Sequence, residues 1–71
     1  MTEADLFESK PDVVSGALVF KGTRIPVDAL FENLAAGLSL DEVLDSFPGI
    51  GRDRAEAAIM LASKKILRDA A

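Results

Sequence analysis

The apolar positions in the first third of the chain predict extended structure. Residues 17–20 (Ala-Leu-Val-Phe) form a short apolar run suited to a strand, and Lys21-Gly22 offers a two-residue hairpin turn with glycine supplying a positive φ. We therefore expect residues 23–25 to return as the partner strand. Residues 1–11 carry few apolar positions and are expected to form an N-terminal arm, ahead of a single domain over residues 12–71.

From Pro26 onward the apolar period becomes helical. Apolar side chains recur at spacings of three, four and seven residues, which predicts an amphipathic helix, and Pro26 suits its first position. Gly37 is expected just beyond its end. Ser39 and Glu42 form the pattern of a capping box, which predicts that a second, short helix begins there and ends before Pro48. A third and longest helix is expected over residues 51–71. The expected core residues are Phe31, Leu34, Leu44, Phe47 and Ile59.

These elements predict a mainly α-helical fold with a short N-terminal β-hairpin and three helices. Two helices joined by a short glycine-containing turn are typical of a helix-turn-helix domain, of the homeodomain-like or winged kind, although any three-helix bundle shows the same pattern. A lone two-stranded hairpin is barely stable in water, so it must pack on helices, pair with a third strand or pair with another chain.

The third predicted helix carries more apolar surface than one core face requires. At about 100° per residue, the core face is expected to hold Ala55, Ala58, Ile59, Ala62 and Ile66. Leu61 lies within a second stripe that also contains basic side chains, and Met60 and Leu67 lie away from both stripes. Several exposed apolar side chains on one helix favour a protein interface, so we predict a partner-binding site at Met60, Leu61 and Leu67.

Basic residues at two places suggest contact with DNA. Arg52 and Arg54 stand at the start of the third helix, where arginine can pair with phosphate or guanine, and both lie off the core stripe. Lys21 and Arg24 belong to the predicted hairpin. Two alternatives stay open: the helix arginines are solvated or pair with nearby acids, and Arg24 fastens the hairpin to a neighbouring carboxylate.

Composition narrows the function classes. The 71 residues contain no Cys, His, Trp or Tyr, so disulfides and the usual transition-metal sites are excluded, an enzyme is not expected, and no cofactor is predicted. A domain this small gains stability from partners, and a homodimer is the simplest one. No apolar run reaches the roughly 18 residues that span a bilayer, and the acidic N-terminus does not resemble a signal peptide, so we expect a cytoplasmic protein.

The net charge of −4 hides two regions of opposite sign. Residues 26–49 contain five acids and no base, whereas residues 51–68 contain five bases and two acids. Local charge matters more than the total because cellular salt screens fields beyond about 10 Å. If the chain binds DNA, the first two predicted helices must face away from it.

The segment from Val14 to Val27, with Gly22-Thr23-Arg24-Ile25-Pro26 at its centre, resembles the family catalogued as domain of unknown function 433. The stretch from Ala36 to Glu42 and the Phe47-Pro48 pair continue the resemblance, which covers about residues 9–65. One departure is Gly49-Ile50-Gly51, where the family commonly has Thr or Ser before the third helix.

The resemblance implies a helix-turn-helix fold and, in many members, a role as a VapB-type antitoxin beside a PIN-like ribonuclease toxin. We therefore predict an antitoxin-like DNA-binding protein that neutralises such a toxin and represses its own operon. Toxin contact would use the third helix, the hairpin or the N-terminal arm. The alternative is a protein-interaction adaptor that does not bind DNA.

Overall fold

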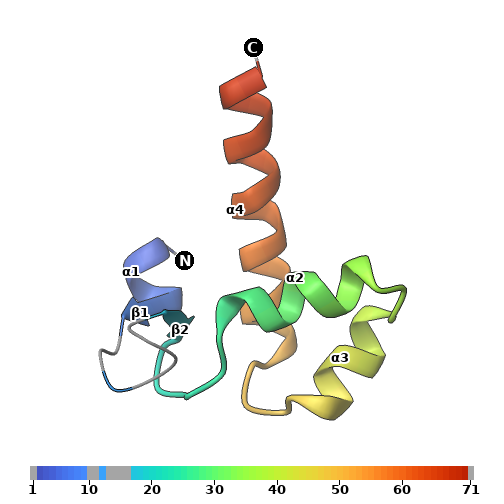
Figure 1. Cartoon of the computed structure of the whole chain (residues 1–71). Helices are drawn as coiled ribbons and strands as arrows, with labels where there is room; N and C mark the ends of the chain where they lie inside the picture. Colours follow the sequence, from blue (N-terminus) through green and yellow to red (C-terminus); the bar gives the residue numbers. More distant parts are fainter. Residues whose placement is uncertain (1, 10–11, 13–16, 71) are drawn as a thin grey trace.

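The computed structural model describes residues 2–9, 12 and 17–70, which form four helices and two strands. In chain order these are α1 (Glu3–Leu6), β1 (Phe7–Ser9), β2 (Leu18–Phe20), α2 (Val27–Ala35), α3 (Leu40–Ser46) and α4 (Arg52–Ala70). The strands and α1 lie on one side of the base of α4, α3 lies on the other, and the far end of α4 rises clear of the rest (Figure 1). The Cα radius of gyration, 12.2 Å, exceeds the roughly 11 Å expected for a compact chain of this length, as the projecting helix requires.

The structure confirms a mainly helical domain with a two-stranded antiparallel sheet near the N-terminus, but the strands differ from those predicted. β2 pairs with β1, so Phe7 faces Phe20, and their rings meet edge to face at 5.7 Å. The predicted return strand at residues 23–25 does not form. The Phe20 amide donates to the Ile25 carbonyl at 3.0 Å, which closes a four-residue loop rather than a two-residue turn.

Thr23 explains why that loop does not continue as a strand. Its hydroxyl donates to the Phe20 carbonyl at 2.8 Å and accepts the Ile25 amide at 3.0 Å, so a side chain takes the place of ladder hydrogen bonds. A single bridge between Val19 and Pro26 is all that remains of the expected pairing in the described part of the chain. Gly22 adopts the positive φ expected of it, 77°.

The segment predicted to be an N-terminal arm contains α1 and β1 and contributes to the interior. Leu6 is fully buried, and its carbonyl accepts the Lys21 amide at 2.7 Å. At the start of α1, Thr2 and Asp5 form a reciprocal capping box, and the hydrogen bonds from the Thr2 amide and hydroxyl hold the pKa of the Asp5 carboxyl below its ordinary value. Residues 1, 10–11, 13–16 and 71, which include the first positions of the family-like motif, lie outside the described residues.

The helix ends follow the chemistry expected from the sequence. At the end of α2, Gly37 has a φ of 102°, its amide donates to the Leu34 carbonyl, and the Leu38 amide donates to Asn33, which is the Schellman arrangement. At the start of α3, the Ser39 hydroxyl accepts the Glu42 amide at 3.2 Å and the Ser39 amide donates to the Glu42 carboxylate at 2.9 Å. These bonds lower the pKa of Glu42, with the Ser39 amide the larger cause.

The interior is centred on side chains other than the five predicted. Phe31, Leu34, Leu44, Phe47 and Ile59 are half-buried and surround the centre. The fully buried set comes from every helix and from β2, together with the α3–α4 loop, and consists of Leu6, Val19, Phe20, Leu30, Val43, Ile50, Ala55 and Ala58. On α4 only Ala55 and Ala58 of the expected core face are buried; Ile66 is 66% exposed because the body ends before the helix does.

Candidate functional site

The first turn of α4 is fastened to the body by Arg54. Its Nε donates to the Ile50 carbonyl at 2.9 Å, Nη2 to the Gly49 carbonyl at 2.6 Å and Nη1 to the Lys21 carbonyl at 2.5 Å. Arg54 is half-buried, so the expectation that it lies outside the packed structure is wrong. Its guanidinium joins the α3–α4 loop to the loop after β2, which are 33 residues apart in sequence from Lys21 to Arg54.

Close packing of these two loops explains why Gly49 sits beside Arg54. A Cβ built on Gly49 would lie 3.2 Å from Ile25 Cδ1, closer than side chains ordinarily pack. The absence of a side chain lets the α3–α4 loop approach the loop after β2, and this brings the Gly49 carbonyl within reach of Arg54. The Gly49-Ile50-Gly51 sequence therefore serves a local packing role.

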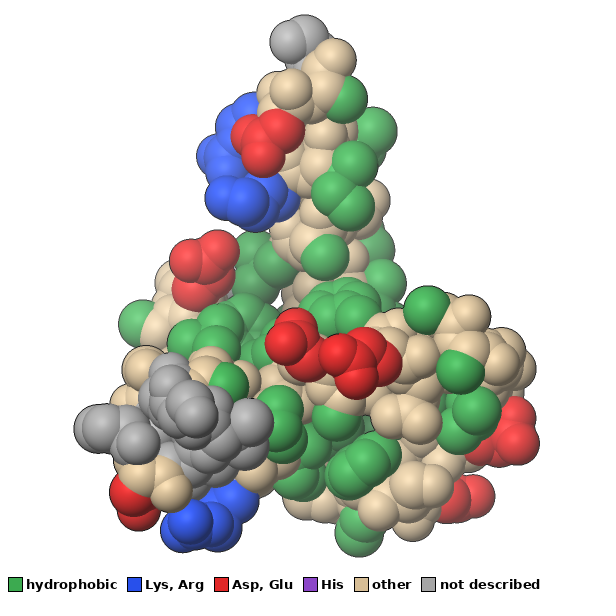
Figure 2. Space-filling model, viewed as in Figure 1, with side chains coloured by type: hydrophobic (Ala, Val, Ile, Leu, Met, Phe, Trp, Pro, Cys, Tyr) green, Lys and Arg blue, Asp and Glu red, His purple; other side chains and the backbone are tan. Residues whose placement is uncertain are grey.

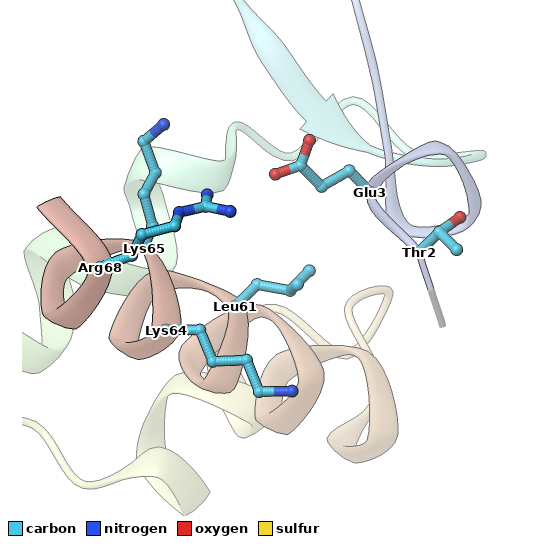
Figure 3. Close-up of a pocket in the computed structure, with 6 residues that line it drawn as sticks. All are labelled: Thr2, Glu3, Leu61, Lys64, Lys65 and Arg68. Carbon is cyan, nitrogen blue, oxygen red and sulfur yellow. The ribbon is translucent and has the colours of Figure 1, made fainter.

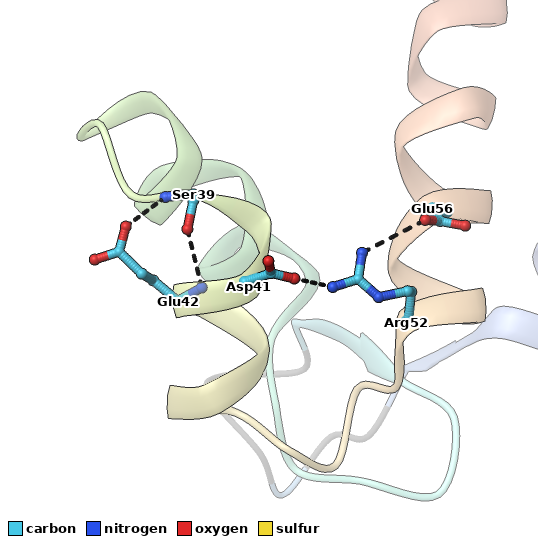
Figure 4. A network of polar contacts seen from close by, with 5 residues as sticks. All are labelled: Ser39, Asp41, Glu42, Arg52 and Glu56. Carbon is cyan, nitrogen blue, oxygen red and sulfur yellow. Dashed lines mark hydrogen bonds and ion pairs between the residues drawn. The ribbon is translucent and has the colours of Figure 1, made fainter.

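Arg52 faces α3 rather than the loop after β2. One terminal nitrogen pairs with the Asp41 carboxylate in the first turn of α3, and the other lies 3.6 Å from Glu56 one turn further along α4 (Figure 4). The Glu56 pair agrees with one alternative considered from the sequence. The Asp41 pair could not be foreseen, because those residues meet only when α3 and α4 pack. Both pairs are solvent-exposed, and such pairs contribute at most about 1 kcal/mol each.

The other two predicted DNA-contacting residues lie on the loop after β2. Lys21 donates from Nζ to the Ala4 carbonyl at 3.3 Å, so it also ties α1 to this loop. The side chain of Arg24 is exposed, and no hydrogen bond or ion pair within the described residues uses it. The proposed lock between Arg24 and a carboxylate is thus not formed there. The loop brings Lys21 and Arg24 to the same end of the molecule as Arg54, while Arg52 points toward α3.

The C-terminal half of α4 has a different character from its start. Met60, Ile66 and Leu67 are 57%, 66% and 68% exposed. In Figure 2, apolar side chains follow one side of the projecting helix and a basic cluster occupies the other. We call the exposed surface at Met60, Ile66 and Leu67 the outer face of α4.

Leu61 does not belong to that outer face. It is half-buried and lines a cleft of about 490 Å³ between α4 and the N-terminal segment, together with Thr2, Glu3, Lys64, Lys65 and Arg68 (Figure 3). The three predicted partner-binding residues therefore lie on two surfaces. The contribution of Thr2 and Glu3 was missed from the sequence because this segment was assigned to an arm. The Thr2-x-x-Asp5 spacing, which is the signature of a capped helix, was the signal that could have found it.

Within the described residues, no group of three carboxylate, histidine or cysteine side chains is placed to hold a metal ion. None of the helices in that part of the chain is long and apolar enough to cross a membrane. The surfaces available for function are therefore the basic end around Lys21, the outer face of α4 and the cleft beside Leu61.

Comparison with known proteins defines the class to which this fold belongs. The profile of the family described as "Protein of unknown function (DUF433)" matches residues 8–62, which is most of the chain, and the chain belongs to this family. The match extends from β1 through the loop after β2 into α4, so it includes both Arg24 and Arg54.

A similar curated protein is "Uncharacterized protein y4eO" of Sinorhizobium fredii (strain NBRC 101917 / NGR234). It is 31% identical over 64 residues, which cover 90% of this chain but 29% of that protein. The chain thus spans less than a third of the length of this relative. No solved structure matches significantly.

Proposed function

We propose that this chain is a protein-binding module of the antitoxin type, which contacts its partner through the outer face of α4. The observation that carries the proposal is that Met60, Ile66 and Leu67 are all more than half exposed on a helix that extends beyond its own core. Apolar surface removed from water on binding is worth roughly 25 cal/mol per Å², so this face favours association with a protein.

The family resemblance suggests the partner: a PIN-like ribonuclease toxin, which the module would neutralise in the cytoplasm. Self-association through the same face, as a homodimer, is part of the proposal. The other mode of dimerisation expected from the sequence, pairing of hairpin strands, is less favoured for β2. One edge of β2 pairs with β1 and the other bridges to Pro26, so both of its edges are occupied.

DNA binding is the second candidate function, and a specific observation supports it. Lys21, Arg24 and Arg54 gather at one end of the molecule, next to the start of α4. In a helix-turn-helix domain of homeodomain-like or winged type, with α4 as recognition helix, this end would approach the phosphates. The module would then repress its own operon as well.

The adaptor alternative, in which the chain binds no DNA, has its own support. Arg54 spends three donor nitrogens on backbone carbonyls and Arg52 pairs with two acids, so both are already satisfied internally. The acids of α2 and α3 add repulsion toward a polyanion. This balance makes protein binding the first proposal and DNA binding the second.

The partner-binding proposal is tested by purifying the chain together with a PIN-like nuclease encoded beside it and measuring RNA cleavage. The wild-type chain should suppress cleavage, and Met60→Ser with Leu67→Ser should weaken suppression at least tenfold. Leu18→Ser, at an exposed leucine on β2, is the matched control and should act like the wild type. Full nuclease activity in the presence of the wild-type chain would exclude the proposal.

The DNA proposal is tested by fluorescence anisotropy on the duplex upstream of the chain's own gene. Lys21→Ala with Arg24→Ala should weaken binding and reduce the salt dependence by about one unit of slope for each phosphate that the variant no longer neutralises. Binding that is undetectable at low salt, or unchanged in this variant, leaves the adaptor as the remaining function.

A further inference from the structure

The cleft between α1 and α4 is one end of a longer groove. A second hollow of about 140 Å³ continues from it and shares Glu3, Leu61 and Lys65 with it. The floor of this continuation is apolar and is made by Phe7, Val27, Phe31, Ala58 and Ala62. Along α4 the combined groove runs from Ala58 to Arg68, about 15 Å at 1.5 Å per residue, which is the length of about three helical turns.

The α4 wall of this groove is positively charged. Lys64, Lys65 and Arg68 line it, whereas Glu3 is the acid on the opposite wall. In Figure 3, Thr2 and Glu3 stand across the space from the α4 side chains, and Leu61 points into it. No hydrogen bond or ion pair within the described part of the chain engages the three cations.

The arrangement of these cations is unfavourable unless something anionic is nearby. Lys64 and Arg68 are four residues apart on one helix, a spacing at which like charges repel. Attraction to the negative end of the helix accounts for Arg68, which is in the last turn, but not for the lysines one turn earlier or for the apolar floor beside them. The groove thus combines an apolar base with an unneutralised basic edge.

We infer that this groove binds an acidic, amphipathic helical segment of a partner protein. Apolar side chains spaced by three and four residues would pack on the floor at Leu61 and Phe31, and carboxylates along one side of the segment would pair with Lys64, Lys65 and Arg68. This is a helix-in-groove mode of recognition, in which the apolar anchors supply affinity and the charges select the partner and its direction.

This site is separate from the outer face of α4, which carries the proposed function. Leu61 faces the N-terminal segment, while Met60 and Leu67 do not line the groove. A failure of one surface can therefore be recognised without reference to the other. Variants at Met60 and Leu67 report on the outer face, and variants at Leu61, Lys64 and Lys65 report on the groove.

The test uses a labelled peptide of about 14 residues, designed with leucines at helical spacing and glutamates along one flank. A second peptide carries lysine in place of each glutamate. The acidic peptide should bind the whole chain, its binding should weaken with added salt, and the lysine peptide should displace it poorly. Equal binding of both peptides, or no binding of the acidic peptide up to millimolar concentration, would overturn the inference.

Variants of the chain localise the binding. Leu61→Ser should weaken binding of the acidic peptide at least tenfold, and Leu18→Ser, the same change at a more exposed leucine, should not. Lys64→Gln with Lys65→Gln should weaken it at least fivefold and flatten its salt dependence. Ala35→Glu with Ser46→Glu changes the net charge of the chain equally, at exposed positions on α2 and α3, and should have little effect.

Two further measurements decide between this site and its competitors. Circular dichroism should show that each variant remains folded, so that lost binding is not lost structure. Vesicles containing phosphatidylserine should not compete with the peptide. If the vesicles bind as strongly as the peptide and Lys64→Gln with Lys65→Gln abolishes both, the groove is a site for anionic amphiphiles in general and the inference of a protein partner is wrong.

Discussion

The two halves of α4 obey different rules although they form one continuous helix. In the first half, Ala55 and Ala58 are buried and Arg54 is bonded to three backbone carbonyls. In the second half, Ile66 and Leu67 are two-thirds exposed and the basic side chains have no partner within the described residues. The first half maintains the fold, and the second half presents surfaces for binding. A helix can do both because its own hydrogen bonds carry it beyond the body on which it rests.

The largest test of this contrast compares a leucine in the body with one on the projecting half. Leu30→Ala removes a fully buried side chain and should reduce the free energy of unfolding by about 2–5 kcal/mol. Leu67→Ala should change it by less than about 0.5 kcal/mol. Urea unfolding followed by circular dichroism measures both. Equal losses would show that the second half of α4 is packed against something in solution.

A second test sets the two arginines of the first half against each other. Arg54→Ala leaves the Ile50, Gly49 and Lys21 carbonyls without a charged donor, and we expect a loss of about 1–3 kcal/mol. Arg52→Ala breaks exposed pairs with Asp41 and Glu56 and should cost less than about 1 kcal/mol. The same unfolding experiment ranks them. A larger loss for Arg52 would mean that the loops do not depend on Arg54.

The third test addresses the outer face directly. Met60→Ser with Leu67→Ser should leave stability within about 0.5 kcal/mol of the parent, since both are surface positions, but should weaken self-association at least tenfold. Light scattering at micromolar concentration reports the mass. A parent chain that is already monomeric at that concentration would remove the homodimer from the proposal while leaving binding to another protein open to the nuclease assay.

The smallest effect concerns the capping box that begins α3, the helix against which Arg52 rests. The folded state lowers the pKa of Glu42 below its ordinary 4.5, so Glu42 stabilises the fold above about that pH and loses this contribution as the pH falls through the lowered value. Glu42→Gln should therefore make stability less dependent on pH in the acidic range. Unfolding curves from neutral pH to below pH 4.5 measure this difference. Identical pH profiles for parent and variant would show that the Ser39–Glu42 bonds do not persist in solution.

The sequence by itself determined the local features of this protein. The ends of α2, the start of α3 and the turn at Gly22 follow from Pro26, Gly37, Ser39 and Glu42, because capping and positive φ depend on only a few neighbouring residues. The helical period beginning near Pro26 and the family motif were likewise readable in one dimension, and the family is confirmed.

Only the tertiary structure decided which surfaces those elements present. β2 pairs with β1 from the supposed arm, and Thr23 diverts the chain from the expected return strand. Arg54 bonds to a loop 33 residues away, and Leu61 separates from Met60 and Leu67 because α1 packs beside α4. A helical wheel shows which residues share a direction, but it does not show where the body beside the helix ends. That boundary is set by long-range packing, and it divides α4 into a half that is buried and a half that is available to bind.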